Sequence, residues 1–163
     1  MGESAKWVVN ASPLICLGKL GHLDWLNQLA SDIVIPVGVA GEIFTGPADD
    51  PARLWLKTDA AALVCAVGPV GEDMKAWDLG SGESEVLAWA RGHRGYTAII
   101  DDRAARRCAD VLNIPVCGTL GILLRAKRAG LCPKLMPLLE YASRVGLYLS
   151  PVLRKEVLRL AGE

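Results

Sequence analysis

The chain has 163 residues and a mass of 17.4 kDa; 52% of its residues are apolar, 22% are charged and the mean hydropathy is +0.29. This length predicts one domain over residues 1–163, and this composition excludes a disordered tail, a collagen-like repeat and a coiled coil. No run of about 18 apolar residues occurs, so no membrane span is predicted. Residues 1–6 lack the basic region and long apolar run of a secretory signal, which predicts a cytoplasmic protein.

The cysteines are an odd number, five, and contain no C-x-x-C pair. The odd number argues against a disulfide framework, and the missing C-x-x-C pair argues against a zinc site. We therefore expect the five thiols to be small core residues in a reduced compartment.

The formal net charge of zero conceals an asymmetry between the two halves of the chain. Residues 1–90 carry 5 basic and 12 acidic side chains, whereas residues 91–163 carry 13 and 6. This asymmetry has two possible interpretations. In one, the solvated helix faces of the two halves simply carry charges of opposite sign. In the other, an acidic pocket lies beside a basic surface, as suits a metal-dependent enzyme acting on a polyanion.

Short apolar runs alternate with helical stripes along the first half of the chain, which predicts an α/β domain with a mainly parallel sheet. Ser12 is expected to cap the first helix, with Pro13 at its first helical position. The predicted elements are, in chain order, a strand at 7–9, a helix from Ser12, a helix at 22–30, a strand at 33–35, a helix at 37–44, a loop at 45–51, and a helix with an edge strand within 52–70.

The second half of the chain continues the alternation after a break at 79–82. The last two helices carry apolar residues that either close the core or face a second protomer: Leu138, Leu139, Val157 and Leu158. The predicted elements are a helix at 83–91, a strand at 95–100, a helix from Arg103, a strand at 114–117, a helix at 120–129, and helices near 134–145 and 151–160.

Oxygen-bearing side chains fall where the strands of this predicted sheet end. Asn10 follows the first strand, Glu42 and Glu83 lie on helices, and the pair Asp101 and Asp102 follows the strand at 95–100. The carboxyl ends of parallel strands meet at one edge of a sheet, where ligands bind. Carboxylates that converge there repel one another unless a divalent cation lies among them, and oxygen ligands favour Mg²⁺ or Mn²⁺.

Each of these residues also has a purely structural interpretation. Glu83 and Glu85 both fall in the first turn of a helix, where the helix dipole stabilises any carboxylate. Glu83 is expected above the buried face and Glu85 nearer solvent, so we select Glu83. The aspartate pair could also form a turn followed by an N-cap. Ser12 could cap a helix or position a water molecule. Arg103, Arg106 and Arg107 could form a solvated helix face or bind phosphate.

Several motifs occur in a distinctive order: Val8-Val9-Asn10-Ala11-Ser12-Pro13, Gly41-Glu42-Ile43, Gly80-Ser81-Gly82-Glu83-Ser84-Glu85, Ile99-Ile100-Asp101-Asp102-Arg103 and Gly118-Thr119-Leu120-Gly121. Over residues 7–161 the chain resembles the PIN-domain family and, within it, the VapC-like branch. The resemblance implies a three-layer α/β/α fold and a Mg²⁺- or Mn²⁺-dependent ribonuclease. It also implies a toxin restrained by a small antitoxin protein, and a homodimer.

Carried over by position, the resemblance places the family's four acids on Asn10, Glu42, Glu83 and either Asp101 or Asp102, and its small hydroxyl residue on Ser12. Glu42 and Asp102 are expected as direct metal ligands, and Glu83 and Asp101 as ligands or water-orienting groups. A bound ion would lower the pKa of a water molecule for in-line attack on phosphate. Asn10 departs from the family's pattern because an amide oxygen coordinates a cation without contributing charge.

Two other functions are compatible with parts of the sequence. Asn10 is the reason to consider a PIN fold that binds RNA or a protein without turnover. A phospho-acceptor receiver domain would have a doubly wound sheet, but its acidic pair follows the first strand, whereas here the pair comes late in the chain.

Overall fold

The computed structural model describes residues 4–163 and contains a sheet of five strands in the order β3-β2-β1-β4-β5. Every neighbouring pair is parallel, as predicted. The strands are β1 (Lys6–Val9), β2 (Asp32–Pro36), β3 (Val64–Cys65), β4 (Tyr96–Ile99) and β5 (Val116–Cys117). The helices are α1 (Ala11–Leu20), α2 (Asp24–Leu29), α3 (Val37–Phe44), α4 (Pro51–Lys57), the 3-10 turn η1 (Ala61–Leu63), α5 (Glu72–Lys75), α6 (Ser81–Gly92), α7 (Arg103–Val111), α8 (Thr119–Arg128), α9 (Met136–Arg144) and α10 (Pro151–Leu160).

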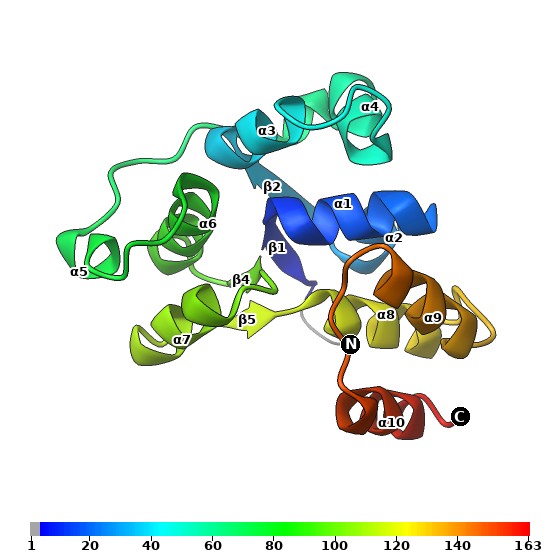
Figure 1. Cartoon of the computed structure of the whole chain (residues 1–163). Helices are drawn as coiled ribbons and strands as arrows, with labels where there is room; N and C mark the ends of the chain where they lie inside the picture. The colour runs from blue at the N-terminus through cyan, green and yellow to red at the C-terminus, as the bar shows by residue number, and fades with distance from the viewer. Residues whose placement is uncertain (1–3) are drawn as a thin grey trace.

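Helices cover both faces of the sheet, which makes the three-layer α/β/α arrangement. Figure 1 shows α6 and α7 on one side of the sheet and α1 and α8 on the other. Helix α6 packs across β1, β2 and β4, while α1 packs against α4, α8 and α9. Helix α3 contacts both α1 and α6, so it bridges the two helical layers at the end of the sheet where the strands finish.

The chain reverses its winding direction between β1 and β4. These two strands are neighbours, with Val9 in register with Ile99, but the helices that follow them lie on opposite faces. The backbone N–H of Asn10 donates to the carbonyl of Ile99 at 3.0 Å, which holds the two strand ends together. In open α/β sheets the crevice at such a reversal is where ligands bind.

The core consists mainly of apolar side chains. Strand β1 is buried along Trp7–Val9, as expected of a strand covered on both faces. All five cysteines are free thiols, and burial raises the pKa of Cys16 to about 11, so this thiol stays protonated. No helix within residues 4–163 combines the length and the apolar character needed to cross a membrane.

Helix boundaries differ from the sequence prediction in two places that affect the site. Helix α1 begins at Ala11, with Asn10 at the N-cap position, so the prediction that Ser12 caps it is wrong. Asn10 makes no side-chain cap hydrogen bond because its side chain is buried toward α6 instead. Helix α6 begins at Ser81, so Glu83 is its third residue rather than its first.

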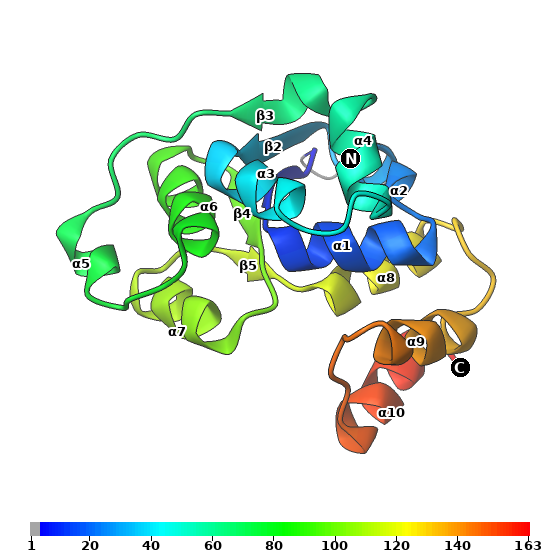
Figure 2. The same cartoon turned by 45° about the horizontal axis from the view of Figure 1, so that its top comes forward.

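Helices α9 and α10 form a hairpin at the end of the chain that packs on α1 and α8 (Figure 2). Leu139 and Val157 are buried, and Leu138 and Leu158 are half-buried against the core. Of the two roles considered for these four residues, the structure therefore supports closing the core.

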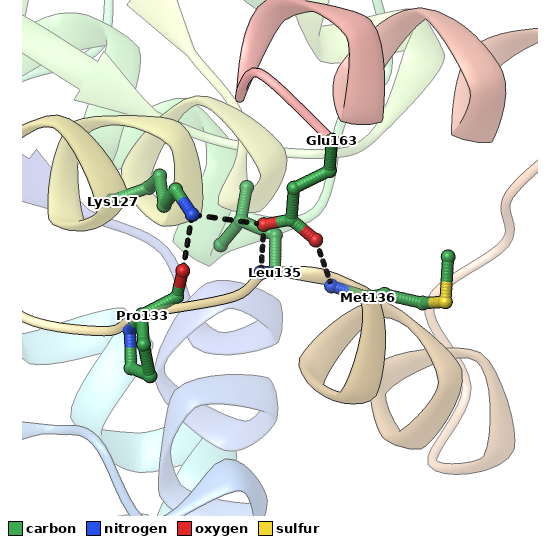
Figure 3. A network of polar contacts seen from close by, with 5 residues as sticks. All are labelled: Lys127, Pro133, Leu135, Met136 and Glu163. Carbon is green, nitrogen blue, oxygen red and sulfur yellow. Dashed lines mark hydrogen bonds and ion pairs between the residues drawn. The ribbon is translucent and has the colours of Figure 1, made fainter.

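The side chain of Glu163 fastens this hairpin (Figure 3). It accepts hydrogen bonds from the backbone N–H groups of Leu135, at 2.5 Å, and Met136, at 3.2 Å, at the start of α9. It also pairs with the Lys127 ammonium at 3.1 Å, and Lys127 in turn donates to the carbonyl of Pro133. The Leu135 N–H is the main reason that the pKa of Glu163 is lowered, and Lys127 and Met136 lower it further.

Replacing Glu163 by Gln should therefore destabilise the protein in a pH-dependent way. A carboxylate whose folded pKa is lowered stabilises the folded state above its unfolded pKa, and this stabilisation is lost as the pH falls through the folded value. We expect the variant to unfold at lower urea concentration than the wild type near neutral pH. The difference should shrink as the pH falls below the ordinary pKa of 4.5 and disappear below the lowered pKa of the folded state. Glu72→Gln, an exposed carboxylate paired with Lys75, is the control and should show little change. If Glu163→Gln were less stable than the wild type by the same amount at every pH, the stabilisation would not come from the charge of Glu163.

Candidate active site

The side chain of Asn10 lies at the centre of the crevice between β1 and β4. It is only 2% exposed, and within the described residues its Oδ1 is buried and accepts no hydrogen bond. A Cβ placed on Gly82 would lie 3.4 Å from this oxygen and would overlap Oε1 of Glu42. The oxygens of Asn10 and Glu42 therefore approach the same point at the start of α6, and the missing side chain of Gly82 leaves the space for them.

The Glu42 carboxyl comes from α3 and faces two other carboxylates. Burial raises the pKa of Glu42 above its ordinary value of 4.5, and the negative charges of Glu83 and Glu85 raise it further. The backbone of Gly82 acts in the opposite direction. Glu83, which the sequence analysis expected near Glu42, is close enough for its charge to act on the Glu42 carboxyl, and a positive charge near Glu42 would offset this repulsion.

Asp101 and Asp102 follow the end of β4 after Ile100, and they have different partners. Asp101 accepts hydrogen bonds from Thr119 at both carboxylate oxygens, from the backbone N–H at 2.8 Å and from the hydroxyl at 2.6 Å. Asp102 is exposed and caps α7 by accepting from the N–H of Ala105 at 2.9 Å. The N-cap considered for this pair is therefore present at Asp102, while Asp101 is fixed in orientation by the start of α8.

Glu85 is a contributor that the sequence prediction missed. We expected it nearer solvent than Glu83, but both are half-buried. Oε2 of Glu85 accepts a hydrogen bond of 2.6 Å from the backbone N–H of Gly38 in α3, and a Cβ at Gly38 would overlap this oxygen. Helices α3 and α6 are thus joined twice, with Glu42 of α3 against Gly82 and Glu85 of α6 against Gly38. The signal in the sequence was Gly38 itself, because glycine early in a helix costs stability and marks a close approach.

A cleft of about 1000 Å³ opens beside these carboxylates. Its polar wall contains Ser12, Glu83, Asp101, Asp102, Arg103 and Arg106. Arg106 is held by a hydrogen bond of 3.1 Å from its guanidinium to the carbonyl of Ile100. Arg107 does not line this cleft, so the three predicted arginines divide into two that face it and one that does not.

The comparison with protein families matches this architecture. The family model DUF3368: PIN domain matches residues 6–163. The chain belongs to the PIN-domain family. No curated protein and no solved structure shows significant similarity to it. PIN domains are generally nucleases, so membership supports the broad class of a phosphodiester hydrolase.

The oxygen donors of this PIN domain fit a hard divalent cation that keeps part of its water shell. Within residues 4–163, no three His, Cys, Asp or Glu side chains are close enough together to hold a metal ion by themselves. Mg²⁺ commonly binds one or two protein carboxylates and completes its shell with water and substrate phosphate. The buried, unpartnered oxygen of Asn10 next to Glu42 is the observation that agrees with such an ion, because a buried polar atom without a partner requires an explanation.

The junction between α3 and α6 can be tested with two glycines of the same helix. Gly38→Ala should push the Glu85 carboxylate away and break its hydrogen bond to the backbone. Gly41→Ala is the matched control, since a Cβ there meets nothing within 4 Å and an alanine favours the helix. We expect Gly38→Ala to be less stable than Gly41→Ala by about 1–2 kcal/mol in urea unfolding. Equal stability of the two variants would mean that the Glu85 contact contributes nothing.

Proposed function

We propose that this PIN domain is a Mg²⁺- or Mn²⁺-dependent endoribonuclease that hydrolyses RNA phosphodiester bonds. The observation that carries the proposal is the buried amide oxygen of Asn10 beside the Glu42 carboxylate at the β1–β4 crevice. Glu83, Asp101 and two arginines are among the residues that line the adjoining cleft, and they supply the other groups that cleavage of a polyanion needs.

Each side chain has a defined part in this proposal. Asn10, Glu42 and Asp101 would hold the cation, which when bound lowers the pKa of water and stabilises charge on the phosphate. Thr119 fixes the orientation of Asp101, as hydrogen-bond partners of ligating carboxylates commonly do. Glu83 orients the attacking water by accepting its hydrogen bond.

The remaining polar groups of the cleft face the substrate. Arg103 and Arg106 bind the RNA phosphates, since guanidinium groups match phosphate oxygens in geometry and charge. The hydroxyl of Ser12, free of the capping role expected for it, is available to a water molecule or a phosphate oxygen. Asp102 keeps its role as the cap of α7, so we assign the fourth acid of the family pattern to Asp101.

A second candidate function is a PIN domain that binds RNA or a protein without turnover. Asn10 favours it, because a neutral amide holds a cation less tightly than a carboxylate and activates water less. The counterargument is that Glu42 already faces the charges of Glu83 and Glu85, so a fourth charge at position 10 would add to the repulsion.

The partners that the VapC-like resemblance implies are also proposals. They are a small antitoxin protein that restrains the nuclease and a second copy of the chain in a homodimer. Exposed apolar side chains on α9 and α10 that do not line the cleft support such an interaction surface: Met136, Tyr141 and Val152.

Removing one carboxylate at a time tests the ribonuclease proposal. Glu42→Gln and Asp101→Asn should each lower Mn²⁺-dependent cleavage of a mixed-sequence RNA by about 100-fold, because each removes a proposed ligand charge. EDTA should abolish the wild-type activity. The measurement is the initial rate of cleavage with fluorescently labelled RNA, with thermal unfolding of each variant to confirm that it is folded.

Asp102→Asn is the matched control for Asp101→Asn, because asparagine caps a helix about as well as aspartate. It should keep activity close to that of the wild type.

Calorimetry of Asn10→Asp tests the second candidate function. Binding without turnover predicts that this change creates or greatly strengthens Mn²⁺ binding. Folded wild-type protein that cleaves no RNA with either metal would end the ribonuclease proposal.

A further inference from the structure

The cleft beside the carboxylates has a second wall of different chemistry. The C-terminal hairpin supplies it, through residues 145–148 of the connection after α9 and through Leu153, Val157 and Leu160 of α10. Ile15 of α1 and Leu120 and Leu124 of α8 add further apolar side chains to the lining. One cleft therefore presents both carboxylates with arginines and a set of apolar side chains.

Three of the side chains on this wall are exposed although they are large and apolar. Tyr148 is 77% exposed, Leu153 41% and Leu160 42%. Among the described residues, the ring of Tyr148 stacks on no other aromatic ring. Exposed apolar groups gathered in one depression are typical of a binding site, and a free aromatic face suits a flat ligand.

The two helices that flank the wall are tied to each other and to α8. The Glu163 side chain ties the end of α10 to the start of α9 and to Lys127 of α8, as Figure 3 shows. Glu156, the acidic residue that α10 contributes to the cleft, forms hydrogen bonds at both carboxylate oxygens with Arg159, at 2.6 and 2.9 Å. Its charge is therefore compensated within α10 and does not oppose an anionic ligand.

We propose that this wall is a nucleobase subsite, in which one unstacked base of the RNA lies on the ring of Tyr148 against Leu153 and Leu160. The inference rests on the proposed ribonuclease function and extends it to the part of the substrate that is not cut. The adjoining phosphate lies at Arg103 and Arg106, which line the same cleft. A paired base is not available for such stacking, so the subsite selects RNA that is single-stranded at this position.

A protein partner is the other occupant that an apolar wall could bind. The arginines beside it favour the nucleic acid, because an apolar peptide would leave both guanidinium groups unused. Stacking of a base on an aromatic side chain strengthens single-strand binding, and its loss weakens binding by about 10-fold or more.

The test measures binding of a labelled RNA of about eight nucleotides, a length within the usual range of single-strand sites, in which each position in turn is made abasic. Fluorescence anisotropy in EDTA keeps the RNA intact during the measurement. For the wild type we expect one abasic position to weaken binding about 10-fold. Tyr148→Ala should bind the intact RNA as weakly as the wild type binds that abasic RNA. The affinity of Tyr148→Ala for the abasic RNA should be little lower still, because the two changes remove the same contact.

Two control variants separate stacking from other effects. Tyr148→Phe keeps the ring and should restore the base preference, whereas Val111→Ala removes an exposed apolar side chain that lies outside the cleft and should bind like the wild type. The subsite is refuted, and the ribonuclease proposal stands, if the wild type cleaves RNA but binds every abasic RNA equally well. The same conclusion follows if Tyr148→Ala shows the same dependence of affinity on the abasic position as the wild type. If the wild type neither binds nor cleaves RNA, both fail.

Discussion

The arrangement of this PIN domain depends on one buried oxygen that has no partner among the described residues. Oδ1 of Asn10 lies where β1 and β4 end, next to the Glu42 carboxylate and below Gly82. A buried polar atom without a hydrogen bond costs about 1–3 kcal/mol. The charges of Glu83 and Glu85 add repulsion at Glu42, which raises its pKa. A cation would relieve both costs at once, and this is why we interpret the crevice as a metal site rather than as a packing defect.

The surrounding structure holds the donors against that repulsion. Glu85 ties α6 to the backbone of Gly38, and Thr119 holds Asp101 from the other side of the crevice. These contacts join segments that are far apart in the chain. The charge asymmetry of the sequence gains a structural meaning here. The acidic first half supplies Glu42 and Glu83, the basic second half supplies the cleft arginines, and the two halves meet where β1 pairs with β4.

The sequence predicted the parallel sheet, the helix that carries Glu42, and Asn10 and the Asp101–Asp102 pair at the ends of strands, because the ends of parallel strands are determined by backbone topology. It did not predict which way side chains turn. Asn10 occupies the N-cap position of α1, but its side chain makes no capping hydrogen bond. Ser12 cannot cap this helix because α1 already begins at Ala11. Asp102 caps α7, and Glu85 turns toward α3. The position of Glu85 depends on a contact between segments dozens of residues apart, and only the glycines at 38 and 82 indicated such close approaches locally.

The central claim is that the oxygens at the β1–β4 crevice bind a divalent cation. Anomalous scattering from crystals soaked in Mn²⁺ tests it without requiring the correct RNA. The account predicts an anomalous peak at the crevice, in contact with Asn10 and Glu42, that is lost in Glu42→Gln. Crystals in which these side chains are ordered and the crevice holds no manganese, at a concentration that saturates other carboxylate sites, would contradict it.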